Sequence, residues 1–441
     1  MTKGYAVVKN ATWIIVCRIV QSVFSLIISM LTARYLGPSN FGTINYASSI
    51  VAFFVPLMQL GFKNTLVHEF IKEPEKEGET LGTAIVLNMV SAALCCLGVL
   101  AFVAIANAGE KETIIVCFLY SLSLLFQALE MSQYWYQAKL LSQYTAVISV
   151  IAYLVVSIFK IFLLATRKNI FWFAVSQAVD YLIISLSLLI IYKRVGRQKL
   201  SFSLERGKKM FSVSKHYIVS SMMVTIFAYV GNVFLKFFLD ESAVGYYSAA
   251  VSCAGMTNFI FAAIIDSARP VILNSKVQNA IYEYRLSALY SIVIVLSVLQ
   301  CIVITVFAEY IVNIVYGPEY SASILPLRIY CWQIGFSYIG TVRNIWILAE
   351  GKQQYMWIIN LCGAIVSILF NLTLIPRFGV MGAAVSAVVT QLFTNVILGF
   401  IIKPIRQNNM LLLKGVNPNI LVHLVKSYKE KIKIDIKNEG E

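Results

Sequence analysis

Eight ionisable side chains lie within or at the ends of long apolar runs of this 441-residue chain. The cations are Arg18, Lys160, Lys236, Arg328 and Arg343, and the acids are Glu130, Asp180 and Asp266. Ionisable groups at membrane depth are costly, so they usually face a cavity, water or a partner. Guanidinium groups bind phosphate oxygens through paired hydrogen bonds, and ammonium groups bind them as point charges. The excess of cations therefore suits an anionic ligand such as a diphosphate.

The cations differ in their expected depth. Arg18 lies well inside the apolar stretch 10–33, where its side chain cannot easily extend to the membrane surface. We therefore expect it to line a cavity, with a structural ion pair as the alternative. Lys236 and Arg328 lie near span ends, so an interfacial position is as reasonable for them as a cavity position. Arg343 is intermediate, and Lys160 is mid-span.

The acids and one proline suggest how transport could be driven. Transport would be driven by an H⁺ or Na⁺ gradient or by removal of the product. If an ion is coupled, Asp180 is the first candidate acid, because the pKa of a buried carboxyl can be raised into the working pH range. Its alternative role is an ion pair with Lys160 across a helical hairpin. Glu130 and Asp266, also candidates for ion coupling, lie near span ends that water reaches. Pro56 removes a backbone hydrogen bond in mid-span and predicts either a hinge or a static kink.

The composition is that of an integral membrane protein. Hydrophobic residues make up 59% and charged residues 13%, whereas soluble domains carry roughly 25% charged residues. The eight cysteines fall in apolar runs without the spacing of a metal site or a disulfide framework, and the three histidines are far apart. We therefore expect no metal or other cofactor. No GxxxxGK[ST] loop occurs, so ATP hydrolysis by this chain is not expected.

Twelve apolar runs of spanning length predict an all-α polytopic membrane protein whose first span is not cleaved as a signal peptide. They cover about 10–33, 41–62, 81–106, 113–133, 143–165, 169–191, 213–238, 243–265, 286–308, 322–348, 355–376 and 379–402. Placing the N-terminus inside puts 26 of the 36 basic residues in inner segments and five in outer ones. The positive-inside rule then predicts that both termini are cytoplasmic. The net charge of +15 is explained by this topology, so nucleic acid is not an expected partner.

The chain divides near its middle. The strongly basic connection 192–215 predicts a cytoplasmic linker between a six-helix bundle, 1–191, and a second one, 216–403, followed by a basic amphipathic tail, 404–441. Leu36, Gly42 and Ala47 recur at an offset of 203 as Leu239, Gly245 and Ala250. Chance similarity between apolar helices is the alternative explanation. Two similar halves with a site between them are a recurring transporter plan. Because Arg18 falls opposite Ser221 at this offset, any diphosphate clamp is asymmetric.

Three stretches resemble a known family. They are ARYLGPSNFGTINYA (33–47), YGPEYSASILPLRI (316–329) and NLTLIPRFGVMGAAVSA (371–387), in that order along the chain. They are similar to the Wzx-type polysaccharide (O-antigen) flippases, the polysaccharide-transport branch of the MATE-like (MOP) flippase superfamily. The resemblance covers essentially the full length.

The resemblance implies a fold of two pseudo-symmetric six-helix bundles arranged in a V. It also implies a flippase, and not an enzyme, in the bacterial cytoplasmic (inner) membrane. Its substrate would be an undecaprenyl-diphosphate-linked oligosaccharide, moved to the outer leaflet by alternating access for O-antigen, lipopolysaccharide or capsule biosynthesis. Membrane lipids, a polysaccharide polymerase and chain-length proteins would be its partners.

Two other functions stay open. An ion-coupled drug or cation antiporter of the same superfamily should line its cavity with acids, whereas the first span offers Arg18 and no acid. A membrane polysaccharide polymerase or ligase usually carries a large outer loop, and no outer loop of that size is predicted here. The passive structural role fits poorly with so many intramembrane charges.

Overall fold

The chain is helical throughout the part that the computed structural model describes, which is residues 3–196 and 198–417, without the side chains of 3–20, 22, 23 and 64. The first bundle consists of α1 (Lys3–Met58), η1 (Phe62–Asn64), α2 (Leu66–Lys72), η2 (Pro74–Lys76), α3 (Glu77–Ala106), α4 (Lys111–Ser121), α5 (Ser123–Leu129), η3 (Glu130–Ser132), α6 (Gln133–Ala138), α7 (Ser142–Ala165) and α8 (Ile170–Val195). No strand occurs in these described residues. The predicted all-α class is confirmed.

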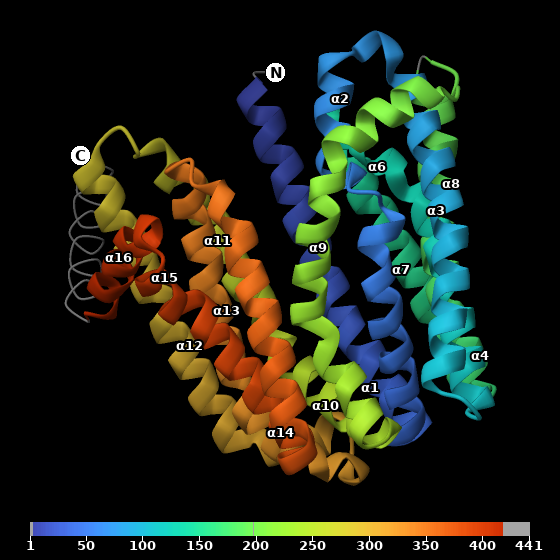
Figure 1. The fold of residues 1–441 in the computed structure, drawn as a ribbon, viewed down its shortest axis with the longest axis vertical. Coiled ribbons are helices and arrows are strands. Elements are labelled where there is room, and N and C mark those ends of the chain that lie inside the picture. The colour runs from blue at the N-terminus through green and yellow to red at the C-terminus, as the bar shows by residue number, and fades with distance from the viewer. Residues whose placement is uncertain (1–2, 197, 418–441) are drawn as a thin grey trace, which may run out of the picture.

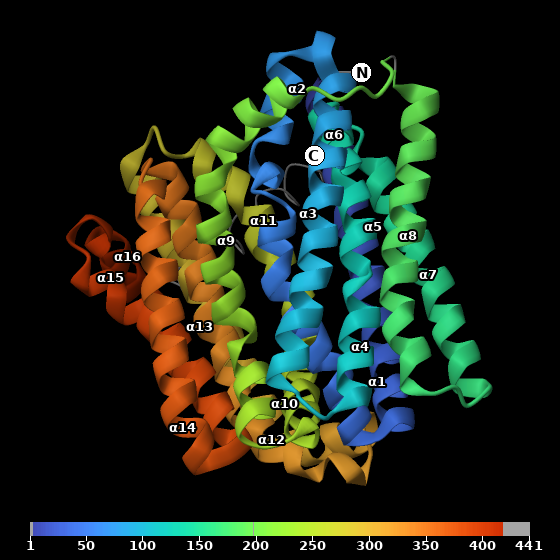
Figure 2. The same ribbon diagram turned by 45° about the vertical axis from the view of Figure 1, so that its right-hand side comes forward.

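The second bundle begins with the long helix α9 (Leu204–Phe238). It continues with α10 (Glu241–Ala254), η4 (Gly255–Thr257), α11 (Asn258–Asn274), α12 (Asn279–Val315), η5 (Pro318–Ser323), α13 (Ile324–Ala349), η6 (Gln353–Tyr355), α14 (Met356–Leu392), the π-helical turn η7 (Phe393–Ile397), α15 (Leu398–Ile401), η8 (Lys403–Ile405) and α16 (Arg406–Val416). The two bundles meet at one end and diverge toward the other (Figure 1). Turned by 45°, the molecule shows α9 between the bundles (Figure 2).

Two helices reverse direction at a glycine. Gly37 in α1 has φ 71° and Gly379 in α14 has φ 58°, conformations that a side chain disfavours. Each helix therefore contains two of the predicted spans, 10–33 with 41–62 and 355–376 with 379–402. These turns lie at the end where the bundles meet, together with those at Gly109 and Gly317 (Figure 1). We call this end the hairpin face, and the opposite end, which carries residues 62–76, 196 and 198–203, the linker face.

The apolar helices agree with a multi-pass membrane protein. Within the described residues, nine helical segments are long and apolar enough to cross a membrane. The predicted fourth span is divided into α4, α5 and α6, and the predicted eighth into α10 and α11. These breaks occur at Leu122, Glu130–Ser132 and Gly255–Thr257, where hydropathy alone gives no signal.

The connection predicted as a linker, 192–215, is mostly helical. Helix α8 continues to Val195 and α9 already begins at Leu204. Between them, the described residues 196 and 198–203 are irregular. Ser203 caps α9, because its side chain accepts a hydrogen bond from the Arg206 backbone NH at 3.3 Å. The predicted boundary at 216 falls inside α9, about three turns after its first residue, and the division into bundles there stays a prediction.

The predicted tail, 404–441, is described only as far as residue 417. Helix α16 buries Asn408, Asn409, Leu411 and Leu412 against the second bundle. The basic amphipathic stretch predicted at 419–436 lies outside the described residues.

Candidate functional site

A chamber of about 830 Å³ lies between the two bundles. Gln21, Ser25 and Ser29 of α1 line it from the first bundle, with Asp180 of α8. Ser252, Asn258 and Asp266 line it from the second. We call this space the interbundle chamber. Its volume is within the ~300–1,000 Å³ of ordinary ligand sites, and most of its lining side chains are polar.

Asp180 lines the interbundle chamber, as expected for an ion-coupling acid, although its role is untested. Its Oδ1 atom is buried and has no hydrogen-bond partner among the described residues. Lys160 is on the neighbouring α7 and does not line the chamber. No ion pair within 4.0 Å joins these two in the described structure, so the hairpin ion pair considered above is not formed. Asp266 also lines the chamber and pairs with Arg269 at 3.3 Å.

A second chamber, of about 850 Å³, is lined by the later part of α1, by α4 to α6, by α8 and by α9. Five glutamines line it: Gln59, Gln127, Gln133, Gln137 and Gln177. We call it the glutamine chamber. Tyr120, Tyr134, Tyr181, Tyr217 and Tyr229 line it as well, and Tyr181 faces both chambers. In all, 17 of its 22 lining residues have polar side chains.

The charges of the glutamine chamber balance. Glu130 and Lys63 are its ionisable acid and cation, and neither forms an ion pair with a described residue. Pro56 lines this chamber inside an unbroken part of α1, and the reversal of α1 is at Gly37 instead. A hinge at Pro56 remains a prediction.

Lys236 closes the hairpin face and does not line either chamber. Its Nζ lies 2.8 Å from Glu110 Oε2 of the first bundle, and it also pairs with Glu241 of α10. The Lys236 side chain is only 7% exposed. Burial raises the pKa of Glu110, but its hydrogen bond and attraction to Lys236 outweigh this effect and leave that pKa lowered. Lys236 is therefore engaged in a structural ion cluster, which accounts for its charge without a ligand.

The repeated glycines meet at this same face. A Cβ atom added to Gly42 would overlap the carbonyl oxygen of Glu241, and one added to Gly245 would overlap that of Pro38. The equivalent positions of the predicted repeat thus pack α1 against α10. Tyr320 adds a hydrogen bond from its hydroxyl to the Ala33 carbonyl at 2.9 Å. Close backbone contact therefore joins the bundles at the hairpin face.

The remaining predicted cations lie elsewhere. Arg343 of α13 is buried and donates to the Thr394 carbonyl at 2.7 Å, while its Nε has no hydrogen-bond partner among the described residues. Arg328, also on α13, likewise has a buried Nε without a partner there. Neither residue lines a chamber. Arg18 lies in α1, three residues before Gln21, and its side chain is outside the described part.

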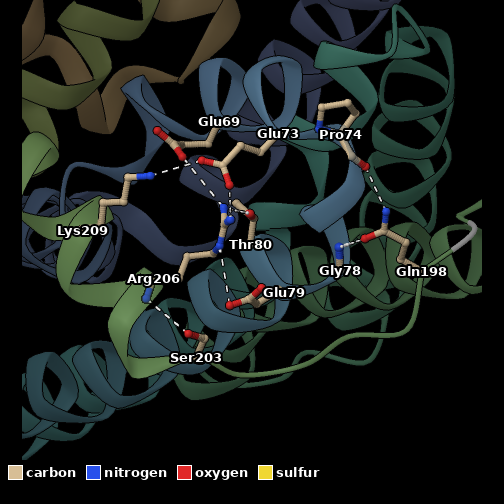
Figure 3. Close-up of polar contacts among 10 residues, drawn as sticks. All are labelled: Glu69, Glu73, Pro74, Gly78, Glu79, Thr80, Gln198, Ser203, Arg206 and Lys209. Carbon is tan, nitrogen blue, oxygen red and sulfur yellow. Dashed lines mark hydrogen bonds and ion pairs between the residues drawn. The ribbon is translucent and has the colours of Figure 1, made fainter.

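The linker face fixes the start of α9 to the first bundle (Figure 3). Arg206 is 6% exposed and lies among three carboxylates, with hydrogen bonds to Glu73 and to Thr80 Oγ1. Glu69 is 3.9 Å and Glu79 3.7 Å from its guanidinium. Lys209 adds a contact to Glu73 at 3.2 Å. The arginine and lysine together lower the pKa of Glu73 to about 2.

The irregular segment before α9 is bound in the same way. The Gln198 side chain accepts from the Gly78 backbone NH and donates to the Pro74 carbonyl, both at 2.9 Å. The Ser203 backbone NH donates to Thr83 Oγ1 at 3.0 Å. The first turns of α9 are therefore bound to α3, so they belong to the first bundle in space.

Sequence reasoning missed the five glutamines and the Arg206 cluster. A signal for the former was present, since Gln127, Glu130, Gln133 and Gln137 follow a helical spacing of three to four residues within an apolar segment. The Arg206 cluster left no comparable signal, because its acids are about 130 residues away in the chain.

Three relatives show where the chain is similar to known proteins. It is 23% identical to the probable low-salt glycan biosynthesis flippase Agl15 of Haloferax volcanii, over 80% of this chain and 74% of that protein. It is 21% identical to the capsular polysaccharide biosynthesis protein CapF of Staphylococcus aureus, over 87% of this chain and 96% of that protein. An uncharacterized membrane protein of Methanocaldococcus jannaschii is 23% identical, and there the chain spans half of the relative's length.

Solved structures show the same fold. The lipid II flippase MurJ, in an inward closed conformation, superposes with a TM-score of 0.74 at 16% identity, over 94% of this chain and 92% of that one. A multidrug resistance MATE family transporter of the MOP superfamily, in its inward-facing conformation, gives 0.65 at 14% identity, over 89% and 96%. The predicted MATE-like fold is confirmed.

A sequence model of polysaccharide biosynthesis proteins matches residues 7–276, more than half of the chain. With its membrane helices, its flippase-like fold and its polar chambers, this chain belongs to the polysaccharide biosynthesis protein family.

Proposed function

We propose that this protein is a flippase that moves an undecaprenyl-diphosphate-linked oligosaccharide from the cytoplasmic to the outer leaflet. One observation carries the proposal: two polar chambers lie inside a pair of bundles that close contacts join at the hairpin face. A polar headgroup needs such an interior to cross the membrane, because polar groups are costly in lipid. The polyprenyl chain would stay in the bilayer.

The linker face is the cytoplasmic face in this proposal. Basic residues gather there, among them Lys72, Lys76, Lys139, Lys193 and Arg194, which the positive-inside rule places in the cytoplasm. The structure would then be the state closed toward the outside. We place it in the bacterial inner membrane, where a polysaccharide polymerase and chain-length proteins would use its product.

The diphosphate would bind in the interbundle chamber near Arg18. Gln21 lines this chamber three residues after Arg18 on the same helix, so positions 18 and 21 are about one turn apart. Asp180 would couple transport to H⁺ or Na⁺. Alternating access requires that the hairpin-face contacts break while the linker face closes.

A liposome assay tests the proposal. The purified protein is reconstituted with the lipid-linked repeat unit, and a glycosidase added outside reports how much substrate reaches the outer leaflet. We expect faster exposure than in protein-free vesicles, and loss of it in Arg18→Ala at unchanged protein level. In cells, deletion should leave lipid-linked repeat units on the cytoplasmic side. Equal rates of substrate exposure in vesicles with and without the protein would refute the proposal.

One observation favours a second function, an ion-coupled cation or drug antiporter. Within the described residues, the interbundle chamber is lined by two acids, Asp180 and Asp266, and by no cation. Acids suit a cationic drug. Drug hypersensitivity of a deletion strain with normal surface polysaccharide would support this function over the flippase.

A further inference from the structure

The glutamine chamber presents hydrogen-bonding groups that the protein itself leaves unused. The amides of Gln59, Gln127, Gln133, Gln137 and Gln177 line it, and none forms a hydrogen bond with another described residue. Gln127 is 8% exposed, Gln59, Gln133 and Gln177 are half-buried, and Gln137 is exposed. Their amide groups keep accessible surface. A ligand in the chamber can therefore form hydrogen bonds with these five amides in place of water.

The chemistry of the lining points to an uncharged ligand. A primary amide offers an acceptor oxygen and two donor hydrogens, so it can bind either group of a hydroxyl or an acetamido substituent. A diphosphate prefers cations, and the single described cation, Lys63, is balanced by Glu130. The chamber thus offers many neutral donors and acceptors and no net charge.

The size and the aromatic residues also fit sugar rings. A volume of about 850 Å³ is in the upper part of the ~300–1,000 Å³ range of ligand sites. Tyrosine rings provide broad apolar faces beside a polar hydroxyl, which match the two faces of a pyranose. Tyr120, Tyr181 and Tyr229 lie in the lining among serine and threonine hydroxyls.

The chamber adjoins the proposed position of the diphosphate. Tyr181 of α8 lines both chambers, while Gln177 and Asp180, on the same helix, line one chamber each. A headgroup whose diphosphate lies in the interbundle chamber can therefore extend its sugars past Tyr181. The lining comes from the first bundle and from residues 217–229 of α9, the helix that begins the second bundle.

We propose that the glutamine chamber is the glycan subsite, which recognises the hydroxyl and acetamido groups of uncharged sugars in the repeat unit. This inference rests on the proposed flippase function. Recognition by several neutral hydrogen bonds makes the chamber a determinant of sugar specificity, separate from diphosphate binding.

The test separates the two ligand parts by binding measurements on the full-length protein in detergent. The probes are the repeat oligosaccharide released from its lipid by mild acid, and undecaprenyl diphosphate without sugars. Replacing Gln127 and Gln177 together with methionine keeps side-chain volume and removes the amides. We expect each lost amide to weaken oligosaccharide binding about five- to tenfold, with undecaprenyl diphosphate affinity unchanged.

The matched control is Gln354→Met, at an exposed position outside both chambers. The pair Gln133→Met and Gln177→Met, at half-buried positions, repeats the test if Gln127→Met disturbs folding. Unchanged oligosaccharide affinity in the chamber variants, or an equal loss of both probes, would overturn the subsite assignment. If the wild-type protein transports lipid-linked substrate in liposomes and the chamber variants bind the oligosaccharide with wild-type affinity, the subsite assignment is wrong and the flippase proposal stands. If the wild-type protein binds neither probe, both the subsite assignment and the flippase proposal are wrong.

Discussion

Replacing Lys236 with methionine should open the hairpin face. The substitution keeps most of the side chain and removes the ammonium that joins Glu110 of the first bundle to Glu241 of the second. Because Lys236 is 7% exposed, methionine fits its surroundings, and the loss concerns charge more than packing.

The expected magnitude follows from the exposure of the partners. Lys236 and Glu241 both belong to the second bundle, so their contact persists when the bundles separate, and the contact with Glu110 is the one that is lost. Glu110 is 42% exposed, and solvent screening reduces its contribution to about 1 kcal/mol or less. A loss of about 1 kcal/mol from the closed state shifts the closed-to-open ratio by roughly fivefold.

Spin-label distance measurements can detect this shift. Labels at Lys111 and Ser321, both exposed on the hairpin face but in different bundles, should show a longer distance population in Lys236→Met. The control Lys168→Met removes a lysine from the same face whose side chain has no described partner, and it should leave the distances unchanged. Identical distributions in the two variants would show that the ion cluster does not hold the bundles together.

Other predictions concern the linker face, the helix crossing and ion coupling. Arg206→Met should lower the unfolding temperature in detergent, because removing a buried cation from among carboxylates costs about 3 kcal/mol of folding stability. Lys208→Met, at an exposed position, should leave the unfolding temperature unchanged. Equal unfolding temperatures in the two variants would contradict a structural role of Arg206. Because the pKa of Glu73 falls from 4.5 to about 2 in the folded protein, its contribution is present above pH 4.5 and is lost as the pH falls toward 2. Thermal unfolding across that range should therefore show a steeper decline for wild type than for Arg206→Met, and parallel curves would argue against it. Gly42→Val should prevent closure of the hairpin face in a protein that still folds. The spin labels at Lys111 and Ser321 should then show the longer distance population. An unchanged, wild-type distance would refute the close helix crossing. Asp180→Asn should abolish the dependence of liposome transport on an ion gradient without reducing substrate binding, and a retained gradient dependence would remove Asp180 from that role.

The sequence by itself determined the elements and their order. Apolar runs long enough for a bilayer predict helices directly, since the backbone must satisfy its own hydrogen bonds in lipid. The repeat of Leu36, Gly42 and Ala47 predicted two similar halves, but only the structure shows that Gly42 and Gly245 lie where the halves meet, at a crossing too close for a side chain. Hydropathy could not show that α9 begins at Leu204, because the basic residues around Arg206 are typical of a loop. Their carboxylate partners are distant in the chain and come near only in the folded protein.

The site depended far more on the tertiary structure. Charge in an apolar run marks a residue that needs a partner, but it does not say whether the partner is a ligand or another side chain. Lys236 pairs with Glu241, which is five residues further along the chain, and with Glu110 of the first bundle, which only packing brings near. Conversely, the glutamines carry no charge, so the sequence alone did not identify them as site residues. Their placement around one cavity, without protein partners, was decided by how α5, α6 and α8 pack against α1 and α9.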